Sequence, residues 1–169
     1  MVRFCFEKLT GLETDLIAFS DDMDGFRKVP DNVPNKEQLS KYLDYPLTTV
    51  PDPFNICNSF GEHNNAKLVE FLNRFNLPFT FQSSTEAYKS GVFNETIKKI
   101  LLNYEKILNV VLPTLGEDRR KTYSPFFPID ENTGKILQVP VNEINTDDFT
   151  ISCKRDSKVV SINFIHRNL

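Results

Sequence analysis

The sequence has little of what a disulfide framework or a zinc site needs. It contains three cysteines and two histidines among 169 residues. Cys5, Cys57 and Cys153 are odd in number and widely spaced, so they form neither a CxxC zinc pair nor a disulfide framework. This usage fits a reducing compartment. We therefore expect three buried thiols and a cytoplasmic protein.

Long hydrophobic runs are also missing. The longest, at residues 16–19 and 110–112, fall far below the roughly 18 residues that a membrane span requires. The N-terminus has no basic stretch followed by an apolar core and a cleavage site, which excludes a recognisable secretion signal. We expect no membrane contact.

An excess of positive charge is absent as well. The net charge is -3 and the isoelectric point is near 5.4, which excludes a generally basic nucleic-acid binder. Nucleic acid would have to meet a local patch of Lys and Arg. There is no GxGxxG, no Walker A loop, and no Ser-His-Asp or Cys-His pattern.

What is present is enough apolar mass for a core: 40% of the residues are hydrophobic, and 15 are Phe. This length and composition predict one compact unit or a small pair. Hydrophobic spacing predicts the following elements: helices at 2–10, 36–43, 62–76, 84–91 and 94–112, and strands at 15–20, 78–83, 135–140, 149–153 and 158–164.

This order predicts an α/β fold in two parts. Residues 1–90 are expected to form a partial Rossmann-type parallel sheet with crossover helices, in which the strand at 15–20 is buried. A Pro-rich loop at 26–60 would lie over the surface and shape a site. Residues 91–169 are expected to form an insertion made of a helix and a small antiparallel β meander.

Acidic residues follow directly on the first strand. Asp21, Asp22 and Asp24 lie where parallel sheets place ligand groups, at the carboxyl ends of their strands. Three carboxylates in four residues repel one another unless a cation, an ammonium group or backbone donors neutralise them. The alternative is that they cap the following loop and face water.

The sequence DMDG at 22–25 also resembles the nucleophile motif of haloacid dehalogenase-like phosphatases, in which the first Asp attacks phosphorus and Mg²⁺ bridges. That family usually places Thr or Ser after the Gly, where this chain has Phe26. No downstream acidic pair completes the metal site. This is therefore a remote alternative.

Two further groups of polar residues are candidates. Glu62 and His63 open a helix, where they either meet a substrate or cap free amides, and no Cys or His lies at ligand spacing from His63. The run EDRRKT at 117–122 supplies Arg119, Arg120 and Lys121, which either grip a phosphate backbone or are solvated loop charge. His166 is expected to be exposed. We predict no metal site.

Several long motifs together carry a resemblance: FSDDMDGFRKVPDNVP at 19–34, PDPF at 51–54, SFGEHNN at 59–65, STEAYKSG at 84–91 and LPTLGEDRRKTYSPF at 112–126. Over residues 1–160 the chain resembles class I lysyl-tRNA synthetases. The resemblance implies a ligase that activates lysine with ATP and Mg²⁺ and transfers it to tRNA. By carry-over, Asp21, Asp22, Asp24, Glu62 and His63 would lie near the lysine and ATP pocket, and Arg119, Arg120 and Lys121 would face tRNA.

The resemblance also shows departures. The HIGH-like and KMSKS-like sequences that bind ATP in this class are absent, residues 161–169 depart from the expected pattern, and residues 128–134 offer no Cys or His for the zinc that some relatives carry. We therefore expect an internal fragment that binds no cofactor tightly and is inactive alone. The alternatives are one piece of a split enzyme that needs complementing fragments, the product of a decayed gene, and a non-catalytic RNA- or protein-binding remnant. An exposed sheet edge at 15–20 would favour self-association.

Overall fold

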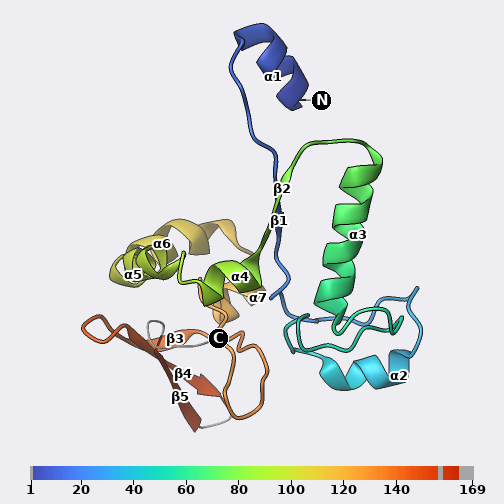
Figure 1. Ribbon diagram of the computed structural model, residues 1–169. Helices are drawn as coiled ribbons and strands as arrows, with labels where there is room; N and C mark the ends of the chain where they lie inside the picture. The colour runs from blue at the N-terminus through green and yellow to red at the C-terminus, as the bar shows by residue number, and fades with distance from the viewer. Residues whose placement is uncertain (1, 156–157, 164–169) are drawn as a thin grey trace. The chain divides into compact units, whose positions relative to one another are not determined.

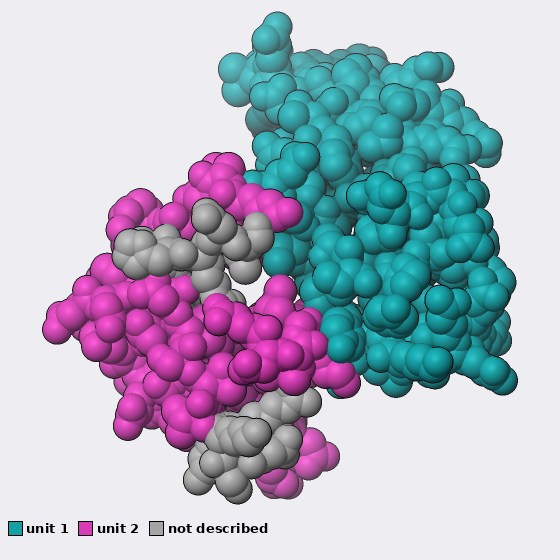
Figure 2. All heavy atoms as spheres, turned by 60° about the horizontal axis from the view of Figure 1, so that its bottom comes forward, with its two compact units in different colours: residues 1–87 teal, residues 88–169 magenta. Residues whose placement is uncertain are grey.

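The protein is described by a computed structural model that covers residues 2–155 and 158–163. The chain divides into two compact units, residues 1–87 and 88–169 (Figure 2). The sequence predicts this boundary three residues later, after residue 90. His166 lies outside the described residues. Within the described part of the chain, no helix is both long and apolar enough to cross a bilayer.

Unit 1 is built around a parallel strand pair (Figure 1). β1 (Ile17–Ser20) pairs with β2 (Thr80–Ser83) in the register Ile17 to Thr80 and Ser20 to Ser83. Between them the chain passes through α3 (Phe60–Arg74), as a parallel pair requires a crossover connection. The predicted parallel α/β arrangement is therefore confirmed.

The expectation that the first strand is buried is wrong. Ile17 is 54% exposed and Phe19 is 45% exposed. Among the described residues β1 pairs with β2 alone, so no third strand of this sheet shields its second edge. An apolar run predicts burial only when neighbouring elements cover both faces.

The remaining helices of unit 1 are short. α1 (Val2–Thr10) ends at Gly11, whose φ of 70° allows the left-handed cap that the sequence predicts. α2 (Lys36–Leu39) continues into η1 (Ser40–Tyr42), and α4 (Ser84–Lys89) follows β2 without a break. The expected capping residue is confirmed, since the Glu86 amide donates to Ser83 Oγ at 3.3 Å.

The Pro-rich segment does more than lie over a surface. With the first residue of α3 it forms the hydrophobic core of unit 1, whose buried members are Phe26, Val33, Leu39, Val50 and Phe60. Gly61 packs against this segment so closely that a Cβ would lie 3.3 Å from the Leu47 carbonyl carbon. The loop and the start of α3 therefore form one packed body.

Unit 2 begins with a helix that the sequence predicts as continuous over 94–112. The structure breaks it into α5 (Asn94–Leu102) and α6 (Tyr104–Val111), because Asn103 leaves helical geometry with φ of −115° and ψ of 17°. Asn103 Nδ2 donates to the Lys99 carbonyl at 2.9 Å, an alternative partner for the helix backbone. η2 (Leu112–Thr114) and α7 (Glu117–Thr122) follow.

The second half of unit 2 is the predicted antiparallel meander. β3 (Val141–Asn145), β4 (Thr150–Arg155) and β5 (Lys158–Asn163) pair in chain order. The prediction of a strand at 135–140 is wrong, because Ile136 makes only an isolated bridge to Ile129. The next strand begins after Pro140, which has no backbone amide to donate. The core comprises Leu101, Tyr104, Phe126, Leu137, Ile151, Cys153 and Ile162.

The three cysteines differ in burial. Cys153 is buried, Cys57 is half-buried and Cys5 is exposed, so the expectation of three buried thiols is wrong. Cys5 lies on α1, which buries none of its residues, and helical spacing alone does not supply a surface to pack against.

Candidate functional site

The carboxyl ends of β1 and β2 meet at one buried carboxylate. Asp22, which is 5% exposed, follows β1 directly, and the segment that enters α4 follows β2. Asp22 Oδ1 accepts from Ser84 Oγ at 2.8 Å, from the Thr85 amide at 2.9 Å and from Thr85 Oγ1 at 2.8 Å. Oδ2 accepts from Ser83 Oγ at 2.5 Å and from Asn65 Nδ2 at 2.9 Å. The carboxylate thus joins both strand ends to two helices.

These donors decide the charge state of Asp22. Burial disfavours the carboxylate and by itself raises its pKa, but hydrogen bonds from Ser83, Asn65 and Thr85 favour the charged form and lower the pKa to about 2. With both oxygens occupied, Asp22 is an anchor within the protein. The sequence predicts that Asp22 lies near the substrate pocket. In the structure, its hydrogen bonds hold the carboxyl ends of β1 and β2 together.

The two other aspartates of the cluster face solvent. Asp21 and Asp24 are both exposed residues. The partial burial of the Asp21 carboxyl, followed by the negative charge of Asp24, raises the pKa of Asp21. Asp24 Oδ1 accepts from the Gly25 amide at 2.9 Å and lies 3.6 Å from Arg27. An arriving cation would relieve the repulsion that Asp21 experiences.

Glu62 and His63 form hydrogen bonds with residues outside the aspartate cluster. The Glu62 amide donates to Ser59 Oγ at 3.1 Å, and Glu62 Oε2 accepts from the Asn58 amide at 3.1 Å, so Glu62 serves the start of α3 as the capping alternative predicts. In the described part of the chain, no hydrogen bond or ion pair joins Glu62 or His63 to Asp21, Asp22 or Asp24.

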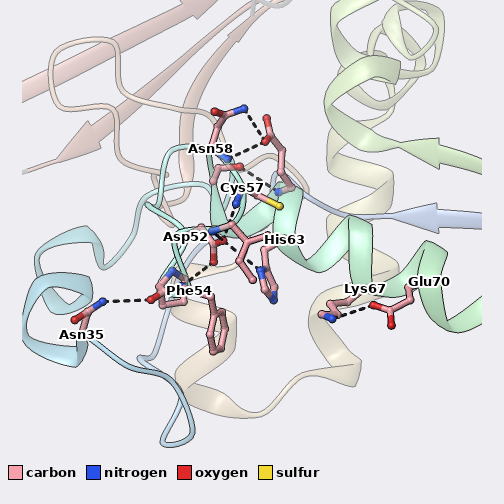
Figure 3. A network of polar contacts seen from close by, with 12 residues as sticks. Asn35, Asp52, Phe54, Cys57, Asn58, His63, Lys67 and Glu70 are labelled. Atoms are coloured by element: carbon pink, nitrogen blue, oxygen red, sulfur yellow. Dashed lines mark hydrogen bonds and ion pairs between the residues drawn. The ribbon is translucent and has the colours of Figure 1, made fainter.

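His63 belongs to a second polar cluster, drawn in Figure 3. Its Nδ1 lies 3.2 Å from Asp52 Oδ2, and its ring stacks on Phe54 with 4.7 Å between centroids. Burial raises the pKa of Asp52, but backbone amides of Cys57, Phe54 and Ile56 outweigh this and lower the pKa to about 2. Cys57 completes the cluster.

Sequence reasoning missed the partners of both clusters. The Ser-Ser-Thr run at 83–85 follows the second strand, and the parallel pairing predicted for that strand could have placed it beside Asp22. Asp52 and Cys57 were missed because neither lies at zinc-motif spacing from His63 along the chain.

The basic residues predicted to face nucleic acid lie on α7, in unit 2. Arg119, Arg120 and Lys121 are exposed. Arg120 donates from Nε to the Leu115 carbonyl at 2.6 Å, and Lys121 lies 3.5 Å from Asp118. Among the described residues no such partner is found for Arg119, so its guanidinium group is not engaged by a bond of this kind.

The geometry disfavours the phosphatase alternative. A nucleophilic aspartate needs an oxygen lone pair directed at phosphorus, and Asp22 uses its two oxygens to accept five hydrogen bonds.

Comparison with known proteins also favours a family other than the phosphatases. A family described as tRNA synthetases class I (K) matches residues 1–166, which runs past residue 161, where the sequence was expected to depart from the pattern. The chain is 49% identical over 157 residues to "Lysine--tRNA ligase" of Rickettsia bellii (strain OSU 85-389), covering 93% of this chain and 30% of that protein. It is 48% identical over 157 residues to "Lysine--tRNA ligase" of Rickettsia felis, with the same coverage. The chain thus spans about 30% of the length of these relatives. It belongs to the class I tRNA synthetase (K) family.

Proposed function

We propose that this chain is part of a lysine–tRNA ligase, which activates lysine with ATP and Mg²⁺ and transfers it to tRNA(Lys). The observation that carries the proposal is the identity of 49% to a lysine–tRNA ligase over 93% of the chain. The match extends over 157 of the 169 residues, so it is not confined to a single motif. Translation takes place in the cytoplasm, which is the compartment that this function implies.

The part proposed for unit 1 is to present negative charge to the lysine ammonium. Asp22 is held by five donors and in turn fixes the loop that carries Asp21 and Asp24. These two exposed carboxylates repel each other, and an ammonium group between them would remove that repulsion. In this proposal Asp22 positions the loop, and Asp21 and Asp24 bind the ammonium group of lysine. Glu62 and His63, predicted for the pocket rim, have structural partners of their own and are second candidates.

The part proposed for unit 2 is contact with tRNA through Arg119, Arg120 and Lys121. Clustered Lys and Arg on an otherwise acidic protein provide the local phosphate affinity that the net charge does not.

Catalysis by these residues alone is not expected. The HIGH-like and KMSKS-like segments that bind ATP in this class are not in the sequence, and electrostatic stabilisation of the activation step needs groups from both halves of the site. Catalysis would need those segments in addition to the residues of this chain. A remnant that binds RNA or protein without catalysis is the second candidate, supported by the exposed basic residues of α7.

The test is lysine-dependent pyrophosphate exchange with tRNA present. The chain is assayed alone, and then mixed with a polypeptide that supplies the remaining segments of a Rickettsia relative. We expect exchange only in the mixture. Asp21→Asn and Asp24→Asn should each raise the KM for lysine about tenfold, whereas Asp31→Asn, a carboxylate that is 90% exposed, should not.

Two results would contradict the proposal. Exchange with another amino acid in preference to lysine would show that the substrate is wrong. No exchange in the mixture, together with tRNA binding by the chain alone, would favour the non-catalytic remnant.

A further inference from the structure

The loop of acidic residues is attached to α3 at two places. The Leu47 amide donates to the Asp24 carbonyl at 3.0 Å, and the Leu47 carbonyl accepts from the Gly61 amide of α3 at 3.0 Å. Asn65, one turn further along α3, donates from Nδ2 to Asp22 Oδ2 at 2.9 Å. Residues four apart lie on the same face of a helix. One face of α3 therefore reaches Asp22 directly and Asp24 through Leu47.

The orientation of the Asn65 amide is fixed by its two partners. An ionised carboxylate only accepts hydrogen bonds, so the amide nitrogen has to face Asp22. The amide oxygen then faces Ser20 Oγ, which donates to it at 2.5 Å. Asn65 is half-buried and Asp22 is buried. The amide thus joins α3 to the last residue of β1 and to the carboxylate that follows it.

Asn65 comes from a different part of unit 1 than the other donors to Asp22. Those donors belong to residues 83–85, at the end of β2 and the start of α4, and they hold Asp22 at the edge of the sheet. Leu47 instead holds Asp24 to the body that the Pro-rich segment forms with the start of α3. The bond from Asn65 links these two attachments. The spacing between the two ends of the acidic loop therefore depends on it.

We propose that Asn65 is a positioning residue for the lysine ammonium group. It holds one end of the acidic loop to the helix that holds the other end, and so sets the separation of the Asp21 and Asp24 carboxylates. Two carboxylates bind one ammonium group best at a particular separation, because Coulomb attraction weakens as either charge moves away. Asn65 needs no contact with lysine for this role. The inference rests on the proposed lysine site.

A competing account gives Asn65 no part in binding. The Asp24 amide donates to the Asp21 carbonyl at 3.2 Å, and the Met23 amide donates to Ser84 Oγ at 3.3 Å, so the turn at 21–24 has bonds of its own. In that account Asn65 contributes only to folding. The two accounts differ in the affinity for lysine of chains that are folded.

The first experiment measures lysine-dependent pyrophosphate exchange in the mixture with the remaining segments of a Rickettsia relative. Asn65→Ala removes both side-chain bonds and introduces a good helix former. It should raise the KM for lysine about tenfold and leave the KM for ATP within about twofold. Asn64→Ala is the matched control, because Asn64 is the exposed neighbour of Asn65 on α3, and it should change neither KM. Each variant is assayed at a temperature at which circular dichroism shows it to be folded.

A second pair of variants keeps the shape of the side chain. Asn65→Asp replaces the donor to Asp22 by an acceptor, so it should raise the KM for lysine at least as much as Asn65→Ala. Asn64→Asp adds the same charge one residue away and should not.

The division of the effect between kcat and KM separates positioning from folding. Loss of stability alone would lower the amount of active chain, and therefore kcat, with the KM for lysine unchanged. That result would overturn the proposal. Absence of lysine-dependent exchange by the parent chain would instead overturn the proposed ligase function.

Nuclear magnetic resonance of the ¹⁵N-labelled chain alone gives a measurement that needs no activity. Asn65→Ala should shift the backbone amide signals of residues 21–25, and Asn64→Ala should leave them in place. Unchanged signals in Asn65→Ala would show that the amide does not position the acidic loop, and would overturn the inference whether or not the mixture is active.

Discussion

Asn65 donates from Nδ2 to Asp22 Oδ2 at 2.9 Å, and its Oδ1 accepts from Ser20 Oγ at 2.5 Å. One amide side chain on α3 thus bonds to the last residue of β1 and to the buried carboxylate just beyond it. Together with the bonds from Ser83, Ser84 and Thr85, this joins four elements of unit 1 at a single point.

Replacement of Asp22 by Asn should destabilise unit 1 by about 2 to 3 kcal/mol. The amide nitrogen of Asn cannot accept, so donors that now bond one carboxylate oxygen would be left buried without a partner. Urea unfolding followed by circular dichroism measures the loss. Asp24→Asn, on an exposed neighbour, should change the free energy of unfolding by less than about 0.5 kcal/mol. Equal effects of the two substitutions would show that Asp22 is no anchor.

The stability of the chain should fall in acid. The pKa of Asp22 is lowered from 3.8 to about 2 in the folded chain. Its contribution is therefore fully present above about pH 4 and is lost as the pH falls through 2, by about 2 kcal/mol. Unfolding measured between pH 2 and 7 should show this loss, and Asp22→Asn should flatten the profile.

Asp21 provides a control of opposite sign for the same profile. Its pKa is raised in the folded chain, so its charge opposes folding at neutral pH and the cost disappears as the carboxyl is protonated. Asp21→Asn should be more stable than the parent at pH 7, and the difference should vanish in acid. A profile in which both variants shift the same way would contradict the assignment.

Binding of tRNA should depend most on Arg119. Arg120 is bonded to the Leu115 and Pro113 carbonyls, so part of its donor capacity is used within the chain. Arg119→Ala should lower tRNA affinity and reduce the salt slope by about one unit, and Arg120→Ala should have a smaller effect. Filter binding at several salt concentrations measures both. Lys36→Ala with Lys41→Ala, exposed elsewhere in the chain, is the control; an equal loss there would indicate nonspecific attraction.

We expect the chain to self-associate through the edge of β1 that does not pair with β2. In the described residues this strand pairs with β2 only, and Ile17 is 54% exposed. Unpaired strand edges attract pairing partners. Light scattering should show a dimer or larger species, and Ile17→Lys should shift it toward monomer. Val110→Lys, which places the same charge at a position 73% exposed on α6, should not. A monodisperse monomer of the parent chain would contradict the prediction.

Much of the fold could be predicted because it depends on local patterns. Gly11 ends α1, Ser83 caps α4, and the strand predicted at 149–153 is found as β4 at Thr150–Arg155, since caps and periodicity act within a few residues. The break at Asn103 was missed because the apolar spacing continues across it. The candidate site was found only in part: Asp22 was placed correctly after β1, but its role as an anchor depends on donors 61 to 63 residues further along the chain.

The sequence by itself determined the family, the α/β order of elements and the position of the acidic residues after the first strand, because long motifs and hydrophobic periodicity are properties of neighbours along the chain. Tertiary structure alone decided which of those acids is buried and anchored, and that Cys57 and His63 meet at Asp52. The physical reason is that burial and hydrogen bonding set the state of a carboxylate, and both depend on residues that only folding brings together.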